Sequence, residues 1–103
     1  MVSNEAEYPH VFVVPERLTA ETREAFRREV FAWFDGAISR RIPRVTLDVS
    51  ATEDIDINGV SLLLVLQRRA AAHEIVMVLR RPSGQVRQMV ILAGLLPLFE
   101  IET

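Results

Sequence analysis

Residues 45–72 read VTLDVSATEDIDINGVSLLLVLQRRAAA, an apolar run followed by an acidic loop and a stretch rich in leucine and alanine. The β-branched residues at 45–49 predict a strand. The composition from Val60 to Ala72 predicts a helix, because leucine, glutamine, arginine and alanine are strong helix formers. A strand that leads into a helix is the repeating unit of α/β proteins, so we expect that fold class.

The same alternation continues on both sides of this stretch. Apolar residues recur at helical spacing from Thr19, an expected N-cap, to Ala37, and again after Ser83 until Gly94 ends the pattern. The continuous apolar run at 75–79 is typical of a strand that is buried on both faces of a parallel sheet. The expected elements are strands at 10–14, 45–49, 75–79 and 98–101 and helices at 19–37, 60–72 and 83–93.

Composition limits the function classes. The chain has 103 residues, half of them hydrophobic, and a net charge of −2, so we expect one globular domain over 1–103 with its core at about 10–101. The charge offers nucleic acid no overall attraction, and the absence of cysteine excludes disulfides and thiolate zinc sites. No apolar run approaches the ~18 residues of a membrane span, and the polar first residues do not resemble a signal peptide. We therefore expect a cytoplasmic protein without direct membrane insertion.

The signatures of enzymes are mostly missing. No glycine-rich phosphate loop follows a strand, and the two histidines lack partners at metal-ligand spacing. Glu53, Asp54 and Asp56 could hold magnesium beside a phosphate, but acidic residues before a helix are also favoured by its positive end. We interpret Asp56 as a helix N-cap and expect no catalysis, metal or cofactor.

The segments Leu47–Ser50 and Ile55–Val60 resemble the STAS domain, the family of bacterial anti-sigma factor antagonists and of the cytoplasmic tails of sulfate transporters. Family members show a strand reading Leu-Asp-Leu-Ser, then Asp-Ser-Ser-Gly before a leucine-rich helix. The later matches, in order, are Ile75–Leu79, Val86–Ala93, Gly94-Leu95 and Phe99–Ile101. The resemblance implies a single sandwich with a mixed, mainly parallel sheet of four or five strands and three helices.

The departures from the family pattern concern the phosphorylation site that regulates many of its members. In the phosphorylatable antagonists, the second serine of Asp-Ser-Ser-Gly accepts a phosphoryl group, and here Asn58 stands at that position. Ile57 replaces the preceding serine, whereas Asp56 and Gly59 remain. Ser61 or Thr52 could serve as an alternative phosphoacceptor, and the alternative for Asn58-Gly59 is plain turn and helix-start chemistry.

Helical spacing assigns the faces of the helix that begins near residue 60. If Gly59, Leu62, Leu63, Leu66 and Ala70 face the sheet, apolar residues remain on the other sides as well. We expect a partner-binding surface there, unless a neighbouring helix covers the flank. Its predicted residues are Asn58, Val60, Ser61, Leu64 and Val65.

The ends of the chain also differ from the family pattern. Many members begin with a two-stranded hairpin and end with a fourth helix, whereas two residues follow Ile101 here, so the C-terminal helix is expected to be missing. A short strand within residues 6–9 is conceivable. We expect some of the apolar residues in 55–66 and 89–101 to be exposed, available to a partner or to a second copy of the chain.

The leading hypothesis is a non-catalytic regulatory module, similar to an anti-sigma factor antagonist. It would dock the loop and helix start at Asp56–Leu66 onto an anti-sigma factor or serine-kinase-like partner. The alternative is an accessory subunit of a membrane ABC transporter, similar to the STAS subunit of lipid-trafficking systems. A nucleotide-binding domain has the least support from the sequence.

Overall fold

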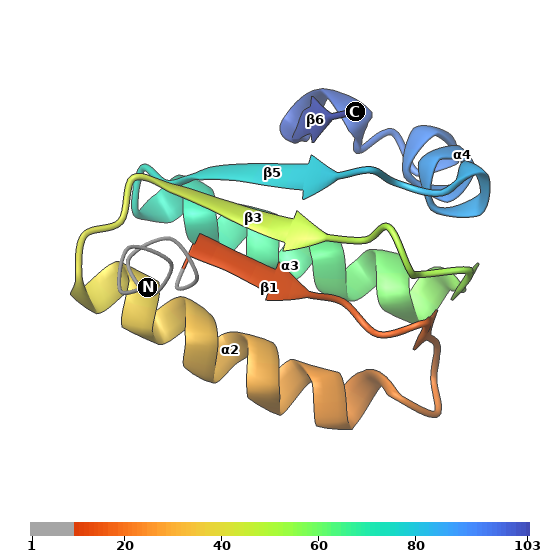
Figure 1. Ribbon diagram of the computed structural model, residues 1–103, viewed down its shortest axis with the longest axis horizontal. Coiled ribbons are helices and arrows are strands. Elements are labelled where there is room, and N and C mark those ends of the chain that lie inside the picture. Colours follow the sequence, from red (N-terminus) through yellow and green to blue (C-terminus); the bar gives the residue numbers. More distant parts are fainter. Residues whose placement is uncertain (1–9) are drawn as a thin grey trace, which may run out of the picture.

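Parallel strands connected by helices form the fold. A computed structural model describes residues 10–103, and Figure 1 shows the arrangement of the elements. The main sheet has the order β1-β3-β5-β6, and each neighbouring pair is parallel, so the predicted fold class is confirmed. Its strands are β1 (Val11–Val13), β3 (Arg44–Asp48), β5 (Val76–Arg80) and β6 (Glu100–Glu102). The other elements are α2 (Arg23–Ser39), α3 (Ile57–Ala72), α4 (Gly84–Leu92) and the 3-10 turn η2 (Leu96–Leu98).

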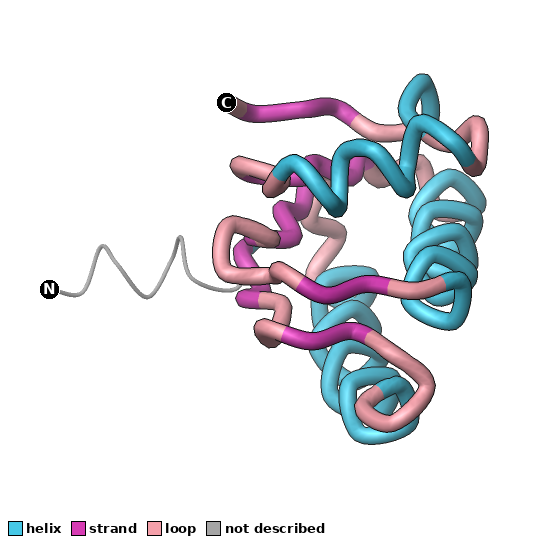
Figure 2. The backbone as a smooth tube through the Cα atoms, turned by 90° about the vertical axis from the view of Figure 1, so that its right-hand side faces the viewer, coloured by secondary structure: helices cyan, strands magenta, loops and turns pink. Residues whose placement is uncertain are grey.

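The two long helices lie on one side of the sheet. Figure 2 shows α2 and α3 together on that side, whereas α4, seen nearly end-on in Figure 1, runs across the end of the sheet. No helix of residues 10–103 covers the opposite face. There, ion pairs join Arg44 to Glu100 and Arg80 to Glu102, and Val78 is buried between them in the sheet.

A second, two-stranded parallel sheet was not predicted. It pairs β2 (Arg17–Leu18) with β4 (Asp54–Ile55), and each strand has only two residues, too few for an alternating pattern to show in the sequence. Leu18 and Ile55 are both buried in the core. The small sheet therefore fixes the segment before α2 against the loop that leads into α3.

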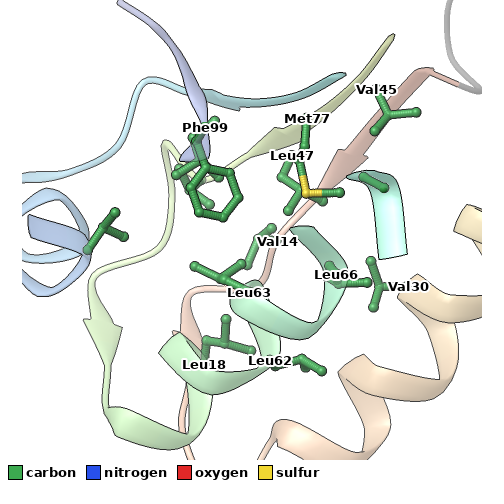
Figure 3. Close-up of a cluster of buried hydrophobic side chains, with 14 of the residues drawn as sticks. Val14, Leu18, Val30, Val45, Leu47, Leu62, Leu63, Leu66, Met77 and Phe99 are labelled. Carbon is green, nitrogen blue, oxygen red and sulfur yellow. The ribbon is translucent and has the colours of Figure 1, made fainter. Parts of the chain in front are cut away.

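One hydrophobic core joins the main sheet, the small sheet and the helices. Figure 3 shows Leu62, Leu63 and Leu66 of α3 directed toward side chains of the sheet and of α2. The alternating residues Val45 and Leu47 of β3 face this core, as the two-residue period of a strand requires. The predicted orientation of the inner face of α3 is thus confirmed, because Gly59, Leu62, Leu63, Leu66 and Ala70 are all buried.

Several predicted boundaries were wrong. The helix expected from Thr19 begins at Arg23, and its N-cap is Thr22, whose hydroxyl accepts a hydrogen bond from the Thr19 amide (3.0 Å). The helix expected from Val60 begins at Ile57, because Asp56 caps it. The last strand begins at Glu100, since η2 occupies the positions before it. A strand within residues 6–9 lies outside the described residues.

The helices α2, α3 and α4 end in the same backbone motif. After α2, α3 and α4 the chain enters the left-handed region at Arg41, Glu74 and Gly94, with φ of 57°, 58° and 73°. The next residue in each case donates its amide five positions back, as in a Schellman motif. These residues, Ile42, Ile75 and Leu95, return the chain to the core. Only the third of these positions has the glycine that is typical of the motif, and the sequence predicted the helix end there, at Gly94.

Candidate functional site

The start of α3 is a junction built on Asp56, which joins three backbone amides. Its carboxylate accepts hydrogen bonds from the amides of Asn58 (2.9 Å) and Gly59 (3.2 Å), two of the amides that the first turn of a helix leaves free. Its second oxygen accepts the amide of Ala20 (3.2 Å), 36 residues away. One side chain therefore joins the predicted loop to the segment before α2, and no short-range sequence pattern identifies Ala20 as its partner.

These contacts shift the titration of Asp56. Desolvation raises the pKa of this carboxyl, but hydrogen bonds from Gly59, Ala20 and Asn58 lower it by more, so its pKa lies below the ordinary value of 3.8. The charged form is thus the one that the junction favours. The negative charge also lies at the positive end of the α3 dipole.

Gly59 is needed by the fold itself. A Cβ at this position would lie 2.3 Å from the carbonyl oxygen of Leu18 and 2.9 Å from a side-chain carbon of Ile55. The small β2-β4 sheet therefore packs directly on the first turn of α3. The absence of a side chain at Gly59 thus allows the close approach of a neighbouring backbone.

The two residues that depart from the family pattern lie in the first turn of α3. Ile57 is 65% exposed, although it is a large apolar residue. Asn58 is half-buried, and its side chain is an amide that offers no hydroxyl to a kinase. The family position for phosphorylation is thus held in a fixed helical turn, next to an exposed apolar side chain.

The predicted partner surface needs a correction. Val60 is only 3% exposed and belongs to the core, and Leu64 is half-buried against it. Residues at intervals of four, starting from Ile57, form the outer side of the helix instead. This outer stripe consists of Ile57, Ser61 and Val65, and Val65 is 43% exposed.

The two alternative phosphoacceptors differ in access. Thr52 is fully buried, and its hydroxyl donates to the carbonyl oxygen of Pro15 (2.8 Å), so in this fold it does not face solvent. Its own carbonyl accepts a hydrogen bond from the Ser83 hydroxyl (2.8 Å), the N-cap of α4. Ser61 is exposed in the outer stripe.

The acidic residues before α3 do not share a site. Asp54 pairs with Arg17 on the neighbouring strand (3.5 Å), and the carboxylate of Asp56 is occupied by backbone amides. Among residues 10–103, no three histidine, aspartate or glutamate side chains converge as metal ligands would. In the same range no helix has the length and apolar character that crossing a membrane requires.

The described strands of the main sheet form no point at which the strand order reverses. Open α/β sheets bind ligands where the strand order reverses. Here the order of the four described strands follows the chain from β1 to β6 without a reversal. A cavity of about 660 Å³ lies on the other side of the molecule, on the face of the sheet without helices, where Val13, Thr46 and Arg80 line it. It includes none of the predicted site residues.

Comparison with known proteins identifies the fold and the family. A crystal structure of a candidate anti-sigma factor antagonist from Thermotoga maritima is similar, with a TM-score of 0.73 and 20% sequence identity over 91% of this chain and 80% of that chain. The NMR structure of TM1081, the same Thermotoga protein, gives 0.71 and 19% over 90% and 73%. No curated protein sequence matches significantly.

The family model described as "Mlab, STAS domain" matches residues 5–99, nearly the whole chain. The resemblance predicted from the sequence is thus confirmed. The chain belongs to the STAS domain family.

Proposed function

We propose that this protein is a non-catalytic regulatory module that docks the start of α3 onto a protein partner, as an anti-sigma factor antagonist does. The observation that carries the proposal is the outer stripe of Ile57, Ser61 and Val65, which exposes two large apolar side chains on a helix held by Asp56. Exposed apolar residues on a rigid element are typical of protein contacts, because binding removes them from water without ordering a loop.

The partner class follows from the family resemblance. Antagonists bind a kinase-like anti-sigma factor through the corresponding loop and helix, and phosphorylation of the serine ends the interaction. Because Asn58 cannot accept a phosphoryl group, we infer that binding here is permanent or is regulated at another residue. Ser61 is the accessible hydroxyl of the outer stripe.

Paired variants test the docking surface. Ile57→Asp and Val65→Asp place a charge in the outer stripe, and we expect both to lose the partner in co-purification from the native host while the melting temperature is unchanged. Ala32→Asp on the exposed side of α2 is the matched control and should retain the partner. Equal recovery of the partner by all three variants would show that α3 is not the docking surface.

The identity of the partner separates two functions. A kinase-like protein favours the antagonist function. An ABC ATPase recovered with a permease favours the alternative, an accessory subunit of a membrane transporter. One observation supports this second candidate: a subunit that is held permanently needs no phosphorylation switch, and Asn58 removes the usual one. A mass of twice the chain in light scattering would identify a second copy as the partner.

A further inference from the structure

A cluster of side chains joins α2 to α3, which lie side by side in Figures 1 and 2. Its centre is Phe31 of α2, whose ring is partly buried against the core. The guanidinium of Arg27 lies 5.0 Å from the centre of this ring, and the guanidinium of Arg69 in α3 lies 5.8 Å from it. The ring thus holds two cations, one from each helix, at distances typical of cation-π contacts.

The two guanidinium groups differ in their charge partners. Arg69 donates to the carboxylate of Asp35 (2.6 Å), so its charge is compensated within the protein. Arg27 takes part in none of the four ion pairs found among residues 10–103. Contact with the face of an aromatic ring does not replace a hydrogen-bond acceptor. The N–H donors of Arg27 are therefore available to a carboxylate from another molecule.

The other charges near the ring do not remove this excess. α3 contains no aspartate or glutamate, and Arg68, like Arg69, is exposed. On α2, the helical repeat places Glu24 one turn before Arg27. Glu24 has Arg28 four residues later, the spacing at which a helix favours an ion pair, and it makes none of the four ion pairs itself. Arg27 and Arg68 thus remain as cations without an acidic partner in the described chain.

The cluster is continuous with the outer stripe of α3. Arg68 and Arg69 lie three and four residues after Val65, the spacings of neighbours on one helix face. Val65 is 43% exposed, and Arg69 carries the surface from it to the ring of Phe31 on α2. An apolar stripe on one helix therefore borders a pair of guanidinium groups that both helices contribute.

We propose that the docking surface spans both helices, and that the protein partner places a carboxylate on Arg27 beside an apolar residue on Val65. This inference rests on the proposed function, because it takes the outer stripe as the docking surface. Arginine binds a carboxylate in a planar, bidentate geometry, and the ring of Phe31 orders the Arg27 side chain before binding, so less freedom is lost. A polyanion such as nucleic acid fits less well, because the carboxylate of Asp35 lies in the same cluster.

A displayed library of random short peptides is the probe that tests the proposal. Peptides are selected on the wild-type chain, and those that lose binding to Ile57→Asp report on the docking surface. We expect these peptides to share an aspartate or glutamate close to a large apolar residue, and to bind Arg27→Glu about tenfold more weakly. Arg87→Glu, an equal change of charge at an exposed position of α4, should bind them like the wild type.

The outcomes separate this inference from the proposed function. Peptides that lose binding to Ile57→Asp but bind Arg27→Glu like the wild type would overturn the role of Arg27 and leave the α3 surface in place. Selection of no peptide that depends on Ile57 would contradict the docking surface itself. Equal melting temperatures verify that the variants are folded, and the neutral Arg27→Gln should give a smaller loss than Arg27→Glu. A wild-type dimer in light scattering that Arg27→Glu dissociates would assign the surface to a second copy and contradict the proposal.

Discussion

Gly59 lies directly beneath the backbone of Leu18, so close that a Cβ on the glycine would be 2.3 Å from the Leu18 carbonyl oxygen. The same backbone segment reaches Asp56, whose amide donates weakly to that oxygen (3.4 Å). The family motif that ends in this glycine therefore has a structural reason in this chain. The absence of a side chain at Gly59 allows the small β2-β4 sheet to pack against the first turn of α3, the turn that exposes Ile57.

Gly59→Ala should destabilise the fold strongly. The methyl group meets backbone rather than a flexible side chain, so α3 or β2 must move, and such overpacking costs about 1–3 kcal/mol. For a domain of this size each kcal/mol lowers the melting temperature by about 4–8 °C. Thermal unfolding followed by circular dichroism measures the change.

Gly36→Ala is the matched control. Gly36 lies inside α2, and nothing is within 4 Å of the position that its Cβ would take. Alanine is the better helix former there, by about 0.5–1 kcal/mol, so this variant should melt higher than the wild type. A melting temperature for Gly59→Ala that equals the wild-type value would contradict the close contact.

The sequence predicts those parts of the fold in which many residues repeat a pattern. The inner face of α3 follows from helical periodicity, and the core strands β3 and β5 follow from runs of β-branched and apolar residues. The β2-β4 sheet could not be predicted, since it consists of two-residue strands whose paired residues, Arg17 with Asp54 and Leu18 with Ile55, are 37 positions apart in the sequence. Its stability comes from the burial of Leu18 and Ile55, a tertiary effect.

The candidate site divides in the same way. Asp56 is recognisable as a cap because capping is local, and its two capping hydrogen bonds, from the amides of Asn58 and Gly59, lie within three residues, whereas its bond from Ala20 could not be predicted. The burial of Val60 and Thr52 depends on segments that are distant in the sequence. One example is Ser83, whose hydroxyl donates a hydrogen bond to the Thr52 carbonyl. Helical spacing alone therefore predicted Val60 to lie on an exposed side of α3, whereas the structure buries it.

Glu74→Gly should raise the stability of the protein. Glu74 has φ of 58° in the motif that ends α3. An L-residue in this left-handed region is disfavoured by about 1–2 kcal/mol, and glycine removes this cost. Glycine's greater freedom in the unfolded chain offsets about 0.4–1 kcal/mol of the gain. We expect a gain of about 0.5 kcal/mol in chemical denaturation. Gly94→Ala, which makes the opposite change after α4, should lose stability, and a gain there would refute the explanation.

Asp56→Asn should change how stability depends on pH. The pKa of Asp56 is lowered in the folded state, so the charged carboxylate stabilises the protein at neutral pH, and this contribution is lost as the pH falls through 3.8 and then through the lower folded value. The wild type should therefore be more stable than the variant at pH 7, and the difference should shrink in acid. Urea denaturation of both proteins across this range measures it. A difference that stays constant would mean that charge is not involved.

Thr52→Val should destabilise the protein, whereas Ser61→Ala should not. The Thr52 hydroxyl is buried and its loss leaves the Pro15 carbonyl without that hydrogen bond, at a cost of about 1 kcal/mol. Ser61 is exposed, and alanine is favourable in a helix. Melting temperatures compare the two. If both variants unfold like the wild type, the hydroxyl of Thr52 is not the structural group described here.

Asn58→Ser should restore a phosphorylation switch if the partner is a kinase. The new hydroxyl would lie at the second position of α3, where the positive end of the helix dipole favours a phosphate, so the modified protein should remain folded. Intact-mass measurement after incubation with the partner and ATP should show one added phosphate on the variant and none on the wild type. The phosphorylated variant should then bind more weakly, since the new charge lies beside Ile57 in the docking surface. A phosphate on the wild type that Ser61→Ala removes would instead place the switch in the outer stripe.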